Sequence, residues 1–432
     1  MTQRIASLFV VFGGFVVQGL LMISGIVTAR VLGVEGRGEI ALVVSLSTMA
    51  AQLTLGGSLP NALTNRLASR RLKARDGVGH LVPRWALLAV VSAVPFAVLF
   101  AILHGDVAEH GVWALGVCVG VLAIQNMAFR LILAALLGEG APMSRVAIAT
   151  LFPQTLVTAS MVVLFVTVDR TSSLLVSLVM VVSYGLGLVV GLWALAPASR
   201  RADGGTQDRL EGDDLWRLTR STYVGSIGPI DGLALDRTLV GAIMGTVALG
   251  LFSAAAALAS LPAMMGTGLA TVLLPRVAAS QADPEQERAL VRRWLVLAAS
   301  VLAALAGLLA LAAEPVIVLA FGEDFRPAVP VARWLVVAAG FLGFRRVLVA
   351  VLQGRDRGGV ASWVELALTP VLVVGIVLAA RADETQGIGI AMLAVGITSV
   401  STLLVLMVRA GRQGPRRPRP GRHRLEQVSP SA

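Results

Sequence analysis

The sequence contains little charge, a single lysine and a single cysteine. Of its 432 residues, 14% are charged and 56% are hydrophobic, whereas soluble chains carry about 25% charge. Because Cys118 is the lone cysteine, an internal disulfide and a multi-cysteine metal site are excluded. The four histidines lack zinc spacing, and no Walker loop occurs. The sequence therefore supports neither a metal or other cofactor nor catalysis, and we expect a protein that is not an enzyme.

Hydrophobic residues, by contrast, gather in long uninterrupted runs. Most runs are close to the roughly 20 residues that span the hydrocarbon core as a helix. The pattern predicts an all-α polytopic membrane protein with about twelve crossings in two pseudo-symmetric six-helix lobes. The expected crossings are 5–29, 40–65, 85–104, 112–137, 146–168, 173–196, 219–244, 248–275, 294–320, 328–353, 359–380 and 387–408.

The charge that is present is mainly arginine, and its placement alternates along the chain. The net charge is +11, and the arginine-rich gaps are Arg66–Arg84, Arg200–Arg220, Arg276–Arg293 and Arg345–Arg357, followed by the tail from Arg409. Cytoplasmic loops of membrane proteins collect arginine and lysine. The bias predicts a membrane protein with both termini in the cytoplasm. It also explains the basic composition through topology and contact with membrane lipids, so no nucleic-acid partner is expected.

Two polar segments suggest how the chain is divided. Residues 197–217 are rich in Gly, Asp and Arg and predict a cytoplasmic linker between an N-terminal lobe (1–196) and a C-terminal lobe (218–410). Residues 411–432 are rich in Pro and Arg and predict a disordered basic tail near anionic lipid.

The two lobes also share short sequence repeats. Phe129–Gly138 parallels Phe344–Gly354 with one residue inserted, and Leu63–Ala68 parallels Leu273–Ala278. Both partners of each pair fall on equivalent helices that run in the same direction. This predicts a parallel repeat related by an axis along the membrane normal, with the substrate site between the lobes.

Polar side chains at mid-membrane depth are candidates for lining that site. Gln18, Gln52, Gln125, Asn126 and Asp231 lie centrally in their expected crossings. Each alone is more often explained by a hydrogen bond between helices than by a ligand contact. Together they predict a hydrated cavity.

The repeat places Arg130 and Arg345 at equivalent points of two crossings. Leaving an arginine in lipid is costly, so each side chain should either snorkel to lipid phosphates or face the cleft between lobes. In the second case the pair offers two guanidinium forks, which bind phosphate oxygens bidentately.

The seventh crossing carries a cluster of unusual residues. Gly228 and Pro229 predict a kink, which serves either as a hinge for alternating access or as a static packing feature. Asp231 is the most central acid and is a candidate for ion or proton coupling. Asp236 and Arg237 follow it and are candidates for coupling or for a latch between lobes.

Several stretches together resemble one protein family. LDRTLVG at 235–241, ARVLGVEGRGEIALVVS at 29–45, LAFGEDFRPAVPVARWL at 319–335 and LQGRDR at 352–357 resemble the bacterial polysaccharide-biosynthesis export proteins. These are flippases of lipid-linked oligosaccharides in the multidrug/oligosaccharidyl-lipid/polysaccharide (MOP) exporter superfamily. The resemblance covers nearly the whole chain. It implies alternating-access translocation of a polyprenyl-(pyro)phosphate-linked oligosaccharide, coupled to an ion or the membrane potential, with polysaccharide polymerases or glycosyltransferases as neighbours.

Three other functions remain open at the level of sequence. An ion-coupled multidrug antiporter of the same superfamily would need a more apolar cavity and a coupling carboxylate such as Asp231. A lipid II flippase would usually have two more helices. The third alternative is a membrane scaffold of a polysaccharide-assembly complex that transports nothing itself.

Overall fold

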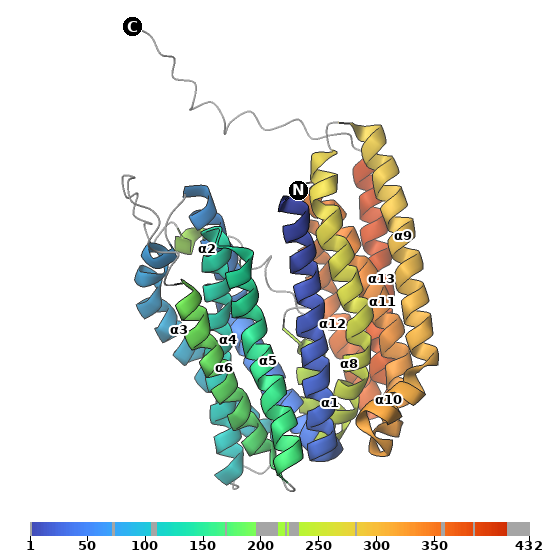
Figure 1. The fold of residues 1–432 in the computed structure, drawn as a ribbon. Coiled ribbons are helices and arrows are strands. Elements are labelled where there is room, and N and C mark those ends of the chain that lie inside the picture. Colours follow the sequence, from blue (N-terminus) through green and yellow to red (C-terminus); the bar gives the residue numbers. More distant parts are fainter. Residues whose placement is uncertain are drawn as a thin grey trace.

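The computed structural model describes residues 2–70, 74–104, 110–168, 171–195, 215–220, 223, 233–280, 283–355, 359–382 and 385–412. Within these ranges all regular structure is helical, and the helices run roughly side by side (Figure 1). They are α1 (Thr2–Ala51), η1 (Gln52–Gly56), α2 (Ser58–Arg70), α3 (Ala74–His104), α4 (His110–Gly138), α5 (Met143–Thr167), α6 (Ser173–Leu195), α8 (Leu235–Ala279), α9 (Pro284–Leu311), α10 (Ala313–Phe321), η3 (Glu323–Ala328), α11 (Val329–Gly354), α12 (Gly359–Arg381) and α13 (Gln386–Arg412).

Ten helices in the described part of the chain are long and apolar enough to cross a membrane. Two of these spans, Gly13–Thr54 and Leu235–Ala278, measure 42 and 44 residues, about twice the length of one crossing. Each is interrupted by a glycine outside the helical conformation, at Gly33 (φ 68°, ψ −167°) and Gly245 (φ 84°, ψ 179°). The all-α polytopic class is confirmed, while the number twelve stays a prediction.

Two expected crossings differ in detail from the observed helices. The segment expected at 294–320 is divided, because α9 ends at Leu311 and the short α10 begins at Ala313. The segment expected at 40–65 passes through the π-helical turn η1 into α2. Apolar composition continues across both breaks, so composition alone does not predict them.

Large apolar side chains on the outside of the helices agree with a lipid surround. Val166, Leu311 and Leu319 are 76%, 83% and 82% exposed. Such positions face hydrocarbon in a bilayer, where every backbone polar group must be satisfied inside the helix. The protein is a multi-pass membrane protein.

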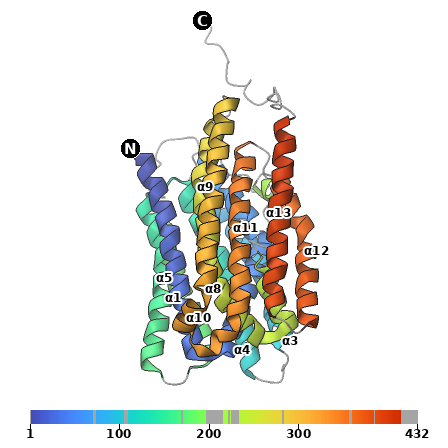
Figure 2. The same ribbon diagram turned by 90° about the vertical axis from the view of Figure 1, so that its right-hand side faces the viewer.

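Figure 1 shows two groups of helices, with α2–α6 on one side and α8–α13 on the other. The first half of α1 lies between them, against α8. The helix α13 ends at the same end of the molecule at which α1 begins (Figure 2). The division into lobes at 197–217 stays a prediction, since most of that segment lies outside the described residues.

The sequence repeats pack in equivalent ways. A Cβ atom on Gly138 would lie 2.8 Å from Cβ of Leu67, and a Cβ atom on Gly354 would lie 2.9 Å from Cβ of Val277. Gly138 and Gly354 end the first repeated motif, and Leu67 and Val277 hold equivalent places in the second. A side chain on either glycine would clash with the facing helix. An equivalent glycine contact therefore sets an equivalent helix crossing in each half of the molecule.

Candidate functional site

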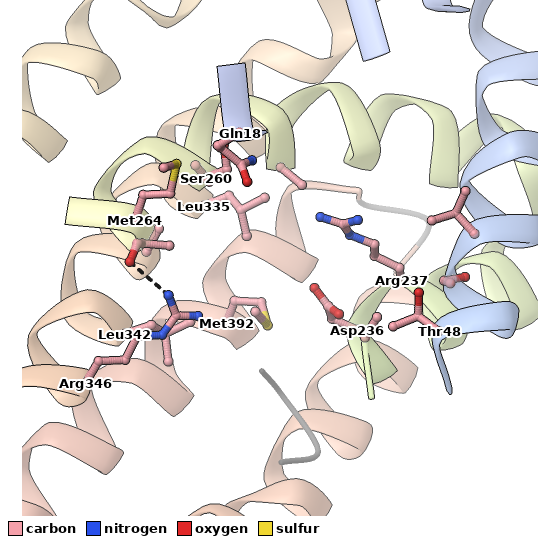
Figure 3. A pocket seen from close by; sticks show the side chains of 17 residues that line it. Gln18, Thr48, Asp236, Arg237, Ser260, Met264, Leu335, Leu342, Arg346 and Met392 are labelled. Carbon is pink, nitrogen blue, oxygen red and sulfur yellow. Dashed lines mark hydrogen bonds between the residues drawn. The ribbon is translucent and has the colours of Figure 1, made fainter. Parts of the chain in front are cut away.

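A cavity of about 400 Å³ lies where α1, α8, α11 and α13 meet. This volume is within the range of roughly 300–1,000 Å³ found for small-molecule sites. Its polar and charged lining residues are Gln18, Ser45, Thr48, Asp236, Arg237, Ser260 and Arg346. Figure 3 shows these side chains converging on one space from helices far apart in sequence.

One wall of the cavity is built by the start of α8. Asp236 and Arg237 lie in its first turn and point into the cavity (Figure 3). Ala234, which directly precedes α8, also lines the cavity and adopts a left-handed conformation (φ 49°, ψ 38°). Such a conformation costs of order 1–3 kcal/mol for a residue other than glycine, and strain of this kind gathers at functional sites. The cavity wall is therefore one of the strained places in the fold.

Arg346 forms the opposite wall and is held in place by α8. Its Nη1 donates hydrogen bonds to the carbonyl oxygen of Ala263 at 2.8 Å and to Oγ1 of Thr267 at 2.7 Å. The backbones of the two helices touch one turn away, where a Cβ atom on Gly266 would lie 2.4 Å from Cα of Gly343. Because α8 and α11 approach so closely, a side chain of α11 reaches the α8 backbone. Arg346 is thus a fixed cation on the cavity wall.

The lining combines opposite kinds of surface. Arg237 and Arg346 supply guanidinium groups from two walls, whereas Met264, Leu335 and Met392 supply an apolar surface. Two separated guanidinium groups suit an anion with several oxygens, because each fork binds oxygen atoms in pairs. The arrangement can hold a ligand that is anionic at one point and apolar at another.

A second cavity, of about 150 Å³, lies within the N-terminal helices. Gln125 and Asn126 from α4 and Gln154 from α5 line it, and Thr48 lines both cavities. Nε2 of Gln125 donates to the carbonyl oxygen of Val181 at 2.9 Å, so this amide links α4 to α6. The predicted polar residues therefore divide between two cavities, with Gln18 in the larger and Gln125 and Asn126 in the smaller.

Arg130 lies in a hydrogen-bonded group inside the N-terminal helices. Its Nε donates to Oδ1 of Asn126 at 3.1 Å, and its Nη1 donates to Oε1 of the buried Gln52. These three residues were each identified from the sequence, and the structure brings them together. Arg130, Asn126 and Gln52 are not among the residues that line the 400 Å³ cavity.

Arg345 pairs with an acid on α12 and is not among the residues that line the 400 Å³ cavity. It is 5% exposed, and its Nη2 lies 2.8 Å from Oε2 of Glu365 on α12. The neighbouring Arg346 lines the cavity instead. Successive helical residues point about 100° apart, and here Arg345 is directed to α12 while Arg346 is directed to the cavity.

The register of the repeat explains why Arg346 was missed. Alignment from the shared phenylalanine pairs Arg130 with Arg345. Counted back from the equivalently packed glycines, Arg130 lies eight residues before Gly138 and Arg346 lies eight residues before Gly354. The inserted residue lies between the two landmarks. Alignment from the glycine end pairs Arg130 with Arg346 instead of Arg345.

Three predicted residues lie outside the described part of the chain. They are Gly228, Pro229 and Asp231. The hinge and the coupling role assigned to them stay predictions.

Comparison with known sequences decides the family. Residues 27–330 match the family described as polysaccharide biosynthesis protein. The chain belongs to this family. The family resemblance read from the sequence motifs is therefore confirmed. No curated protein matches the sequence.

Solved structures of MOP-superfamily transporters share the fold. An inward-facing multidrug resistance MATE family transporter of this superfamily superposes with a TM-score of 0.66 at 15% identity, over 92% of this chain and 96% of that chain. The lipid II flippase MurJ in an inward closed conformation gives 0.69 at 11% identity, over 92% and 87%. A MOP-superfamily transporter from Pyrococcus furiosus, for which a reversed polarity of the binding pocket suggests a different function, gives 0.60 at 15% identity, over 95% and 96%.

Proposed function

We propose that this member of the polysaccharide biosynthesis protein family is a flippase. It moves a polyprenyl-(pyro)phosphate-linked oligosaccharide across the bacterial cytoplasmic membrane for cell-surface polysaccharide assembly. The observation that carries the proposal is the 400 Å³ cavity with Arg237 and Arg346 on opposite walls. Family membership and the MOP-type fold agree with it.

The chemistry of such a substrate matches the lining. A saccharide diphosphate is polar and anionic, so it needs a hydrated and cationic path through the bilayer. Arg237 and Arg346 can each bind two phosphate oxygens at once. Gln18, Thr48 and Ser260 offer donors and acceptors to the first sugar. The polyprenyl chain can stay in the bilayer, since the surrounding helices expose apolar side chains to lipid.

In this proposal, transport is driven by an ion or proton gradient or by the membrane potential. Asp236 lines the cavity beside Arg237, and a carboxylate there can respond to both a bound cation and an arriving anion. Asp231 remains a second candidate. Polysaccharide polymerases or glycosyltransferases are the proposed neighbours in the membrane, and both termini are proposed to lie in the cytoplasm.

Purified protein in liposomes tests the proposal. The vesicles contain a fluorescent polyprenyl-diphosphate-linked oligosaccharide, and a membrane-impermeant oxidant of sugars reports how much substrate lies in the outer leaflet. We expect the protein to raise the flipping rate at least tenfold over empty vesicles, and Arg237→Gln/Arg346→Gln to remove that increase. Flipping of lipid II alone, or efflux of organic cations alone, would replace the proposal by a lipid II flippase or a multidrug antiporter. No movement of any of these would favour the scaffold.

A further inference from the structure

Two glycines lie where the two interrupted helices resume after their breaks. Gly38 in α1 comes five residues after Gly33, and Gly250 in α8 comes five residues after Gly245. The two glycines are separated by 212 residues, which agrees with the spacing of the sequence repeats. This end of α1 and α8 lies remote from Thr2, at the lower end of the view in Figure 1.

Each glycine contacts the backbone of the other helix. A Cβ atom on Gly38 would lie 1.8 Å from the carbonyl oxygen of Thr246, and a Cβ atom on Gly250 would lie 2.0 Å from the carbonyl oxygen of Val34. Val34 and Thr246 are the residues directly after the two interrupting glycines. The internal repeat that relates α1 to α8 therefore also relates the two contacts to each other. Together they make one reciprocal joint between the halves of the molecule.

Only glycine permits this approach. A Cβ atom lies along the direction of one glycine Cα–H bond, so each carbonyl oxygen receives a Cα–H group, as at many close helix crossings in membranes. Any side chain at Gly38 or Gly250 would force the helices apart by roughly 1 Å or more. At these two points the joint consists of backbone against backbone.

A third contact bridges the same end of the molecule. Nε of Arg30, near the end of the first segment of α1, donates to the carbonyl oxygen of Ala320 at 2.8 Å. Ala320 lies in the last turn of α10, where a cation is favourable because the helix dipole places negative charge there. Arg30 thus adds a polar tie to the glycine contacts.

The joint lies between the cavity and this end of the molecule. Ser45 lines the cavity and comes seven residues after Gly38, and Ala256 lines it and comes six residues after Gly250. Both separations correspond to about 10 Å along a helix. When the joint is closed, the backbones of α1 and α8 touch roughly two turns beyond the cavity.

We propose that Gly38 and Gly250 form a reciprocal glycine latch that closes the transport pathway at the end remote from the termini, and that Arg30 fastens it. The latch must open for the cavity to reach that side of the membrane. The inference does not depend on the identity of the substrate. The latch proposal can therefore be wrong while the proposed flippase function is right. It can also be right if the substrate belongs to another class.

Cysteine accessibility without any substrate tests the latch. In a Cys118→Ser background, Ser260→Cys reports on the cavity, since Ser260 lines it. A membrane-impermeant maleimide is applied to each face separately in right-side-out and inside-out vesicles. We expect Gly38→Ala and Gly250→Ala to raise labelling severalfold from one face, the same face for both variants.

Gly116→Ala is the matched control. Its Cβ atom would lie 2.8 Å from the carbonyl oxygen of Ala97, so it creates a milder clash of the same kind between α3 and α4, away from the joint. Labelling that stays at the parent rate in both latch variants overturns the proposal, as does an equal rise in Gly116→Ala. If the latch variants fail to accumulate, Arg30→Gln decides, because it introduces no clash: raised labelling supports the latch and unchanged labelling overturns it.

Discussion

Arg345 and Glu365 form an ion pair between α11 and α12, with 2.8 Å between Nη2 and Oε2 and with both residues buried. Breaking such a pair leaves an uncompensated buried charge and costs about 3–5 kcal/mol, whereas replacing both partners by apolar residues is often close to neutral. We expect Glu365→Gln to lower the thermal stability of the purified protein strongly. We expect Arg345→Met/Glu365→Leu to recover most of that loss.

The exposed pair of Arg326 and Glu323 is the control for this prediction. Its side chains are 53% and 67% exposed, with Nε and Oε2 2.8 Å apart. Exposed pairs contribute little, so Glu323→Gln should leave the unfolding temperature nearly unchanged. Equal effects of Glu365→Gln and Glu323→Gln would contradict the structural role assigned to the buried pair.

Two double lysine variants distinguish the guanidinium pair at the cavity from the pair first suggested by the sequence. Lysine keeps the charge but loses the bidentate fork. We expect Arg237→Lys/Arg346→Lys to reach the membrane at normal abundance and to lose at least tenfold in flipping rate. We expect Arg130→Lys/Arg345→Lys to lose abundance or stability rather than flipping rate per molecule, because these arginines bond buried protein groups and do not line the 400 Å³ cavity. Flipping assays normalised to protein amount measure the rate per molecule of each double variant. A loss of flipping rate in Arg130→Lys/Arg345→Lys, with none in Arg237→Lys/Arg346→Lys, would instead favour phosphate binding by Arg130 and Arg345.

Thr267 is expected to position Arg346. Its Oγ1 accepts a hydrogen bond of 2.7 Å from Nη1 of Arg346, and a bond to a charged group contributes about 1.5–3 kcal/mol. Thr267→Val should therefore reduce the flipping rate about tenfold at normal abundance, and Thr267→Ser should restore it. Thr271→Val is the control, since the Thr271 hydroxyl donates only to the carbonyl oxygen of Thr267 in its own helix. A loss in Thr271→Val as large as in Thr267→Val would indicate a general effect on α8.

The orientation in the membrane gives a further prediction from the arginine bias. Glu285 lies at the start of α9 and Asp324 follows α10, and both are exposed. In a Cys118→Ser background, Asp324→Cys should be labelled by an impermeant maleimide from outside intact cells. Glu285→Cys should be labelled only after the membrane is permeabilised. The opposite pattern would invert the topology and place the glycine latch at the cytoplasmic side.

Much of the fold follows from local chemistry that the sequence displays directly. Hydrophobic runs of membrane-spanning length determine the class, because backbone polar groups in lipid must be satisfied within each helix. A break falls at Gly245, between the crossings expected at 219–244 and 248–275, since glycine readily adopts the positive φ found there. The repeats around Gly138 and Gly354 predicted equivalent packing, and the structure shows it.

The tertiary structure alone decided which polar side chains share a space. Adjacent residues on a helix point in different directions, so hydropathy cannot tell whether Arg345 or Arg346 faces the cavity. Glu365 lies within the crossing expected at 359–380, but its partner Arg345 is on another helix, and their pairing depends on how α11 and α12 pack. Gly38 and Gly250 resemble many other glycines in the sequence. Only the crossing of α1 and α8 brings each against the carbonyl oxygen of the other helix.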